Sequence, residues 1–344
     1  MTLLTSSTAA ASRTRRALIA TALGALTLVT LVVLSAGLGL VSISPIDTVR
    51  ALLFREGVDP QHAAVIWTIR APRIVVAALV GAALAACGTT LQAVFRNPLA
   101  DPGVTGVSSG AAVGAVAGIT LGLAGSLSWG VPLAAFCGAL VVTGILHLAL
   151  RTVPNGGGAT LILVGVSINA FAGAIISILI ANAENDALAR GAMFWMSGDL
   201  ELRDWGHVLL AVFPIVIGTT FLLTRGRHLD ALTLGDDVAH TSGIDTGRTR
   251  LSLLLATSLV TGAAVSVSGI IAFVGLVVPH AVRLIIGSKH SYLMPISMLA
   301  GSVFLVAADT VARSAFGLTA IQTGAVCALV GAPVFLAMLL RRRA

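Results

Sequence analysis

Long apolar runs recur along this chain and constrain its fold more than any other feature. About ten stretches near 20 residues long each carry at most one charged residue, at 17–40, 72–95, 104–123, 130–150, 160–181, 207–224, 250–267, 270–287, 292–309 and 321–340. A helix of about 20 apolar residues crosses the hydrocarbon core of a membrane. The chain is 57% hydrophobic and 10% charged, so it has too little polar surface to cover a soluble core. A single tyrosine and the lack of an alternating pattern argue against a transmembrane barrel. We predict an all-α polytopic membrane protein with about ten transmembrane helices.

The positions of Lys and Arg predict the orientation of these helices. If the N-terminus is cytoplasmic, seven of the 21 basic residues lie outside and the other fourteen lie inside. Basic residues concentrate in cytoplasmic loops, so this bias favours a cytoplasmic location for both termini. The seven outside residues are Arg50, Arg55, Arg70, Arg73, Arg190, Arg203 and Arg313.

The N-terminal segment has two possible interpretations. Arg13–Arg16 before an apolar run imitates a secretory signal peptide, but the run from Ala17 to Leu34 is longer than a typical signal core. We therefore expect residues 1–16 to be a cytoplasmic tail and 17–40 to be the first span. The transmembrane domain then covers residues 17–340, with a polar cytoplasmic loop at 225–249, and residues 341–344 form a cytoplasmic C-terminus.

Three blocks in the chain form a recognisable pattern. They are RAPRIVVAALVGAALAACGTTLQAVFRNPLADPGVTGVSSGA at Arg70–Ala111, GIIAFVGLVVPHAVR at Gly269–Arg283 and ADTVAR at Ala308–Arg313. In this order they resemble the FecCD family, the permease subunits of ABC importers for iron–siderophores, haem and vitamin B12. The resemblance implies a type II ABC importer permease architecture. It also implies three kinds of partner: a second permease chain (identical or homologous), two ATP-binding cassette subunits and an extracytoplasmic substrate-binding protein.

Three arginines predicted to face outward run against the positive-inside bias. Arg70 and Arg73 are three residues apart, so they share one face at the start of a helix. In the family, arginines at these positions and at that of Arg313 receive acidic residues of the substrate-binding protein. The resemblance therefore implies docking by charge-assisted contacts. Anchoring at lipid headgroups, or local pairing of Arg313 with Asp309, would also account for them.

The longest polar insertion expected inside contains a candidate helix bounded by glycines. Within Leu234–Ile244, Gly235 would precede the first turn and Gly243 would take the left-handed conformation that ends it. Two carboxylates would occupy the first turn, where they suit the positive helix end. In the family, this loop is the coupling helix that docks into the ATPase; an ordinary solvated loop is the alternative. The implied coupling residues are Leu234, Gly235, Asp236, Asp237, Ala239 and Gly243.

A polar turn follows the second span and suggests a gate. Asn97-Pro98 ends one helix because proline disfavours helix in the residue before it. Gln92, one turn earlier, should face protein or water and not lipid, either on the substrate pathway or in a helix-to-helix hydrogen bond. The family resemblance adds the Val153–Thr160 loop near the inner gate. The candidate pathway residues are therefore Gln92, Asn97, Pro98 and Thr160.

Several classes of chemistry lack their motifs. The chain has no phosphate-binding G-x-x-x-x-G-K-[ST] sequence, no H-E-x-x-H and no G-x-S-x-G. We expect no catalytic residue, no metal site and no cofactor bound by this chain; ATP and Mg would be used by the partner ATPase. No basic–aromatic patch indicates nucleic-acid binding, and membrane lipid is the expected surrounding. A secondary transporter would need an intramembrane acid, for which Asp309 is the candidate.

The family resemblance favours a ferric siderophore as substrate, with haem and cobalamin as alternatives. One departure from the family lies near the last span. The expected Glu-Leu-Pro-x-Gly is Ala320-Ile321-Gln322-Thr323-Gly324 here, which leaves the outer end of this span open. A different binding protein or a second, non-identical permease chain would each explain it.

Overall fold

The computed structural model describes residues 2–39, 41–54, 58–122, 129–152, 158–314 and 321–341. Every regular element in these ranges is a helix. Seven helices are long and apolar enough to cross a membrane, and α5, α14 and α16 are shorter apolar helices. The ten are α1 (Thr2–Gly37), α4 (Ala71–Val94), α5 (Val107–Thr120), α7 (Gly130–Thr152), α8 (Gly158–Ala181), α10 (Trp205–Thr224), α13 (Thr246–Ser268), α14 (Val274–Ile286), α15 (His290–Ser314) and α16 (Thr323–Arg341).

These ten helices confirm the predicted polytopic all-α fold. Each predicted span overlaps one of them, including the closely spaced pair at 250–287, where the chain leaves α13 at Gly269 and enters α14 after Phe273. Both of these residues have positive φ angles, +68° and +69°. These angles let the short connection at 269–273 turn the backbone from one helix into the next. Helix α1 begins at Thr2, so the residues predicted to form a cytoplasmic tail are helical and continuous with the first span; their cytoplasmic location stays a prediction.

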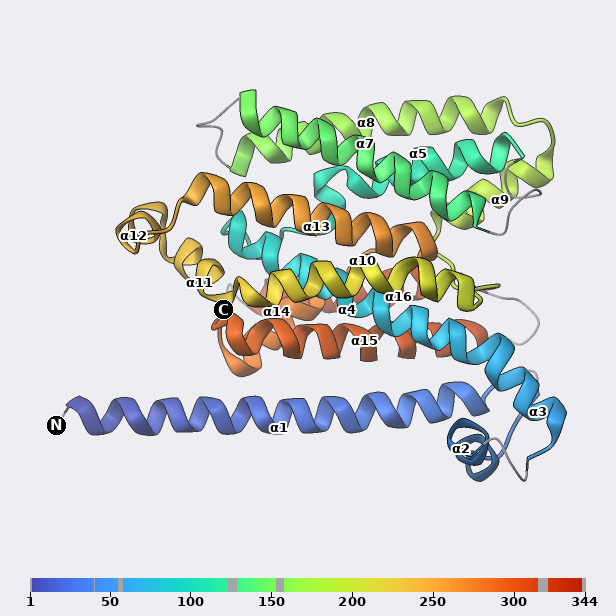
Figure 1. Cartoon of the computed structure of the whole chain (residues 1–344), viewed down its shortest axis with the longest axis horizontal. Helices are drawn as coiled ribbons and strands as arrows, with labels where there is room; N and C mark the ends of the chain where they lie inside the picture. The colour runs from blue at the N-terminus through green and yellow to red at the C-terminus, as the bar shows by residue number, and fades with distance from the viewer. Residues whose placement is uncertain are drawn as a thin grey trace.

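Short helices cap the two ends of the bundle. At one end lie α2 (Pro45–Leu53), α3 (Pro60–Ala64), the π-helical turn η1 (Val65–Arg70) and α9 (Asp186–Met196). At the other end lie α11 (Gly226–Leu234) and α12 (Asp236–Thr241) (Figure 1). The turn η2 (Pro102–Thr105) lies between α4 and α5. We name these ends by the predicted topology: the outer end carries α2, α3 and α9, and the inner end carries α11 and α12.

Helix α4 forms the centre of the bundle, and small residues let its neighbours approach closely. A Cβ atom on Gly81 would collide with the carbonyl of Gly301 in α15, and one on Gly88 would collide with the carbonyl of Gly275 in α14. Such glycine contacts are a common means of helix association in lipid, where backbones pack by van der Waals contact. Helix α4 is thereby held rigidly against both α14 and α15.

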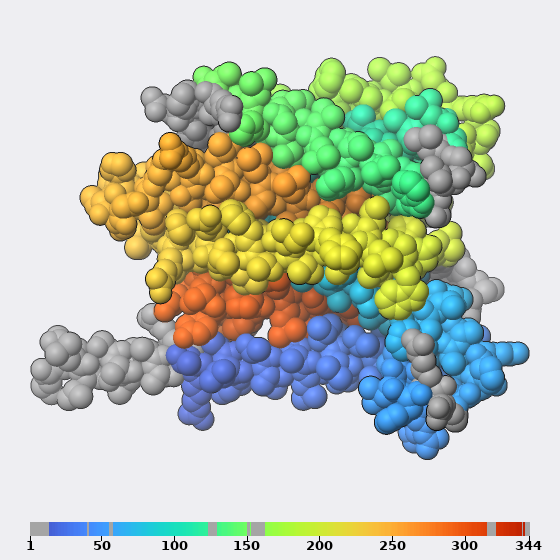
Figure 2. Space-filling view, in the orientation of Figure 1, coloured from blue at the N-terminus to red at the C-terminus, as the bar shows by residue number. Residues whose placement is uncertain are grey.

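The outermost helices are far less buried. Helix α1 runs along one edge of the bundle, mainly against α15, and α7 and α8 form the opposite edge (Figures 1 and 2). Few residues in the apolar windows of α1 and α8 are buried, whereas most residues in those of α4 and α13 are buried. Exposed apolar faces on helices of this length suit a lipid or protein surrounding.

Candidate functional site

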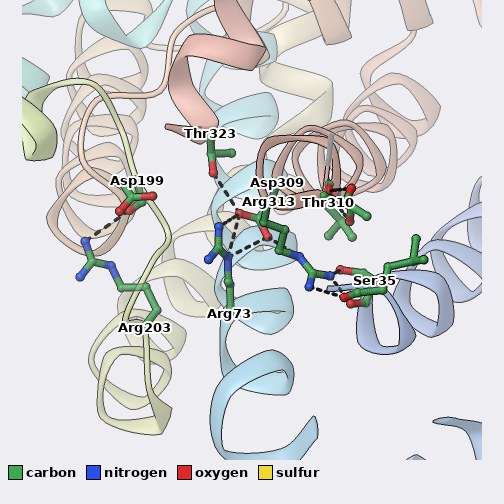
Figure 3. Close-up of polar contacts among 11 residues, drawn as sticks. Ser35, Arg73, Asp199, Arg203, Asp309, Thr310, Arg313 and Thr323 are labelled. Carbon is green, nitrogen blue, oxygen red and sulfur yellow. Dashed lines mark hydrogen bonds and ion pairs between the residues drawn. The ribbon is translucent and has the colours of Figure 1, made fainter. Parts of the chain in front are cut away.

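The outer end of the bundle holds a buried ion pair between α4 and α15. Arg73 Nε donates to both Asp309 carboxylate oxygens at 3.0 Å, and its Nη2 donates to Oδ1 at 2.8 Å (Figure 3). Asp309 is only 1% exposed. A bidentate guanidinium–carboxylate contact of this kind fixes the relative orientation of the two side chains. The pair therefore fastens α4 to α15 near their outer ends.

Arg70 and Arg313 bind the segment that follows α1. Arg70 is buried, and its two terminal nitrogens donate to the carbonyls of Ala36 and Val41 at 2.6 and 2.5 Å. Arg313 donates to the carbonyl of Leu38 at 2.7 Å and to both oxygens of Ser35. Carbonyl groups at a helix C-terminus have no intrahelical partner, so these two arginines cap the outer end of α1.

The Asp309 carboxylate also accepts a hydrogen bond from a hydroxyl group of α16 and lies near a second, more distant guanidinium group. Thr323 Oγ1 donates to Asp309 Oδ1 at 2.9 Å, and Arg313 Nε lies 3.8 Å from Oδ2. Beside this group, Arg203 Nη2 donates to the carbonyl of Asp199 at 3.3 Å (Figure 3). We call Arg70, Arg73, Asp309, Arg313 and Thr323 the outer arginine cluster. It joins α1, α4, α15 and α16.

The structure thus brings together all three arginines for which we expected docking. Their guanidinium groups contact acceptors of the chain itself: Arg73 binds a carboxylate, Arg70 binds two carbonyls, and Arg313 contacts both kinds of acceptor. Local pairing of Arg313 with Asp309, the alternative to docking, is also present. This ion pair is longer than the one between Arg73 and Asp309. The docking role itself stays a prediction.

The predicted glycine-bounded helix is confirmed at the inner end. Gly235 precedes α12 with φ +131°, and Gly243 follows it with φ +79°. Leu234 is 72% exposed, whereas Ala239 is fully buried against the bundle. Asp237 is exposed on the first turn of α12. The helix therefore presents one face outward and packs the other, as expected of a docking element.

Asp236 in α12 is held by two arginines from different parts of the chain. Arg96, just after α4, and Arg250, in α13, both donate to Asp236 Oδ1, the latter at 2.7 Å. Arg96 Nε also donates to the carbonyl of Leu232 in α11 at 2.7 Å. Our sequence analysis counted these arginines only as anchoring charges, because nothing in the sequence shows that they converge on one carboxylate.

Three of the predicted pathway residues lie where α4 ends: Gln92 in the last turn of α4, and Asn97 and Pro98 in the turn that follows it. Gln92 is buried, and its Nε2 donates to the carbonyls of Gly275 and Leu276 in α14 at 3.3 and 3.2 Å. Gln92 therefore makes the helix-to-helix hydrogen bond that we gave as the alternative to a place on the substrate pathway. Asn97 Oδ1 accepts from the amide of Leu99 at 2.9 Å and stabilises the turn around Pro98. The side chain of Thr160, in α8, and the loop 153–157 lie outside the described part of the chain.

Asp101 is a further titratable group in this turn that the sequence did not single out. Its Oδ1 accepts from the amide of Gly103 at 2.8 Å, and its other oxygen faces Gly275 of α14. Burial raises the pKa of this carboxyl to about 6, against the opposing effect of the Gly103 amide. Asp101 can therefore change its charge close to neutral pH at the contact between the turn and α14.

The described residues contain no cluster of three or more His, Cys, Asp or Glu able to hold a metal ion. The three cysteines in the described ranges are free, with Cys87 and Cys327 buried and Cys137 exposed.

Comparisons with known proteins identify the family to which this fold belongs. Residues 26–341 match the model of the FecCD transport family. The chain is 46% identical to the cobalamin import system permease protein BtuC of Halobacterium salinarum over 82% of its length and 75% of the relative. It is 39% identical to the hemin transport system permease protein HmuU of Yersinia pestis, over 81% of this chain and 84% of that one.

A solved structure gives the same fold. A metal-chelate type ABC transporter in an inward-facing conformation superposes with a TM-score of 0.82 at 29% identity, covering 92% of this chain and 97% of that one. The match extends over the helical bundle and not over one segment of it. The chain therefore belongs to the FecCD transport family and is a multi-span, non-catalytic permease subunit of an ATP-binding cassette importer.

Proposed function

We propose that this permease carries a cobalt or iron tetrapyrrole-type chelate, with cobalamin as the first candidate and haem as the second. The observation that carries the proposal is the 46% identity to a permease named for cobalamin import, together with 39% identity to one named for hemin transport. This replaces the ferric siderophore favoured by the family resemblance alone, which we keep as the third candidate.

The substrate proposal is tested by uptake into proteoliposomes that contain the whole importer. Radiolabelled cyanocobalamin, haem and a ferric hydroxamate siderophore are supplied separately with their binding proteins, with ATP enclosed on the inner side. ATP-dependent accumulation of cyanocobalamin or haem alone supports the proposal. Accumulation of the siderophore alone contradicts it.

The partners proposed are those of the family: a second permease chain, two ATPase subunits and an extracytoplasmic binding protein. Support for the ATPase contact is the exposed surface where α11 meets α12: Leu234, the last residue of α11, is 72% exposed, and Val238 in α12 is 43% exposed. In this proposal, Leu234, Gly235, Asp237 and Gly243 belong to the contact surface, while Ala239 packs the helix onto the bundle. The orientation then places both termini in the cytoplasm, since α1 begins at the end where α12 lies (Figure 1).

The binding protein would dock on the outer end, over the outer arginine cluster. The cluster contains three guanidinium groups and one carboxylate, which pairs with Arg73 and Arg313, and this excess of positive charge within the cluster supports attraction of acidic residues. Arg70 and Arg313 would also act indirectly, because they fix the carbonyls of the segment after α1. Gln92, Asn97 and Pro98 would then form the inner turn beside the substrate pathway, with Gln92 holding α4 to α14.

The docking proposal predicts salt-sensitive binding. Arg70→Gln should weaken binding of the binding protein to the reconstituted permease most at low ionic strength, because screening removes long-range attraction. The matched control is Arg190→Gln, since Arg190 is exposed and makes only a 4.0 Å contact with Asp186. Equal affinities for wild type and Arg70→Gln at low salt would contradict direct docking at this residue.

A further inference from the structure

We infer that Arg96 is the positioning residue through which a movement of α12 reaches the membrane helices α4 and α14. The inference rests on the proposed function, in which α12 docks on an ATPase subunit. It concerns a residue outside the docking surface itself. Arg96 lies in the turn after α4, and its side chain extends to both inner helices, α11 and α12.

The first step is the connection between α12 and Arg96. The Asp236 carboxylate accepts from Arg96, while Arg96 Nε binds the Leu232 carbonyl of α11 at 2.7 Å. One guanidinium group therefore holds the junction of α11 and α12 at two points. Arg250 binds the same carboxylate oxygen at 2.7 Å from the start of α13. Because planar guanidinium groups hold their partners in fixed directions, the two contacts of Arg96 couple its position to that of α12.

The second step is the backbone of Arg96. Its φ angle is +48°, in the left-handed region that residues other than glycine rarely adopt. Its amide donates to the Ala93 carbonyl at 3.2 Å, and the next amide, that of Asn97, donates to the Gln92 carbonyl at 3.1 Å. The side-chain contacts with α11 and α12 thus hold a strained residue directly at the end of α4.

The third step leads from this turn into the membrane. Gln92 lies one helical turn before Arg96 and donates to the carbonyls of Gly275 and Leu276 in the first turn of α14. Gly88 and Gly275 lie in backbone contact one further turn along α4. Packed interfaces of this kind shift as units and do not deform continuously. A displacement of Arg96 is therefore passed to α4 and α14 together.

A nearby ion pair of the same type provides the comparison. Arg248 lies 3.3 Å from Asp245, and both side chains are largely exposed. The two residues are neighbours at the start of α13, so this pair joins no other helix. Substitution of Arg248 removes a charge of the same kind from the same inner end of the bundle without touching the contact of Arg96 with α12.

The experiment uses the full importer, purified with its ATPase subunits and reconstituted in proteoliposomes. Wild type is compared with Arg96→Ala, Arg96→Lys and the control Arg248→Ala. Three quantities are measured: the amount of ATPase subunit that co-purifies, the basal rate of ATP hydrolysis, and the amount of cyanocobalamin or haem transported per ATP hydrolysed. A fourth is the ATP-dependent change in the mobility of a spin label at Leu99→Cys, in the turn after Arg96, where the native side chain is 44% exposed.

If Arg96 transmits the movement, Arg96→Ala should keep ATPase binding and basal hydrolysis while transport per ATP falls about tenfold. The label response should fall in parallel. Arg96→Lys should restore part of both, because it keeps the charge for Asp236 but cannot bind the Leu232 carbonyl at the same time. Arg248→Ala should match wild type in all four measurements.

Two results would overturn the inference. One is an unchanged transport ratio and label response in Arg96→Ala. The other is loss of ATPase binding in Arg96→Ala, which would make Arg96 part of the docking surface. The label separates this inference from the substrate proposal: if wild type transports neither cyanocobalamin nor haem but its label still responds to ATP through Arg96, the substrate proposal fails and the inference stands.

Discussion

Replacing Arg73 with alanine should destabilise this permease strongly, because it would leave Asp309 as a buried charge without its main partner. Arg73 makes three hydrogen bonds to this carboxylate, which is 1% exposed. Breaking one side of a buried ion pair costs about 3–5 kcal/mol. Thr323 at 2.9 Å and Arg313 at 3.8 Å would still face the carboxylate. We therefore expect the lower end, about 3 kcal/mol.

The unfolding assay can use the cysteines of the chain itself. Cys87 and Cys327 are fully buried, whereas Cys137 is exposed. In a Cys137→Ser background, a thiol-reactive dye therefore reports only the opening of the bundle. The free energy of unfolding is obtained from labelling of the detergent-solubilised permease over a range of denaturant concentrations.

The controls separate a lost ion pair from a lost side chain. Arg50→Ala breaks an exposed ion pair with Asp47 at 3.9 Å, also at the outer end of the bundle. It should lower the free energy of unfolding by less than about 1 kcal/mol. The double variant Arg73→Met/Asp309→Asn removes both charges and should cost less than Arg73→Ala alone, because no buried carboxylate is left unpaired. The reasoning is refuted if Arg73→Ala costs no more than Arg50→Ala, or if the double variant is less stable than the single one.

Three further predictions concern other contacts. Thr323→Val should cost about 2 kcal/mol in the same unfolding assay, since it deletes a hydroxyl donor to a buried carboxylate, and Thr323→Ser should restore most of it. Gly81→Leu should prevent stable assembly of the bundle, because its Cβ would already collide with the Gly301 carbonyl; recovery of a folded protein at wild-type yield by size-exclusion chromatography would contradict this. Asp101→Asn should stabilise the permease more at pH 8 than at pH 5. The folded-state pKa of about 6 lies above the ordinary value near 4, so ionisation of Asp101 destabilises the folded state. This destabilisation is absent below about pH 4 and complete above about pH 6. An equal effect of the substitution on the free energy of unfolding at both pH values would contradict the prediction.

The positions of the ten apolar helices within the described ranges could be predicted because hydropathy marks each of them, although only seven are long enough to cross a membrane. The short elements at the outer end could not. Helix α2 contains Asp47 and Arg50, and α9 contains Asp186 and Arg190, so neither forms an apolar run. The π-helical turn η1 also escaped prediction, since VIWTIR lies just before the predicted second span and has no sequence feature that marks a π-helical turn.

The candidate sites show a similar division. The glycines around α12 could be located because a helix end in the left-handed conformation has a local sequence signature. The partners of Arg73 and Arg96 could not, because 236 residues separate Arg73 from Asp309 and 140 separate Arg96 from Asp236. A single sequence carries no signal for pairs that only tertiary packing brings together.

Two residues next to the departure from the family pattern fix the start of the last span. Gly324, which keeps the family residue, donates its amide to the Gly198 carbonyl at 2.9 Å, and a Cβ there would collide with the Ser197 carbonyl. Thr323 supplies a hydroxyl to Asp309. The start of α16 is thereby fixed by one close backbone contact and one polar side chain, and neither requires the acid or the proline of the family pattern.

The outer arginines can now be ranked as docking residues by how their charge is compensated. Arg73 shares a bidentate ion pair with Asp309, and Arg313 lies 3.8 Å from the same carboxylate. Arg70 binds carbonyl oxygens, which accept its hydrogen bonds but do not cancel its charge, and within the described ranges it forms no ion pair. A carboxylate of a docking protein would therefore gain most from Arg70, where no resident anion competes. Because Arg70 is buried and binds the carbonyls of Ala36 and Val41, the docking experiment with Arg70→Gln is interpreted only if the unfolding assay gives the variant the stability of wild type.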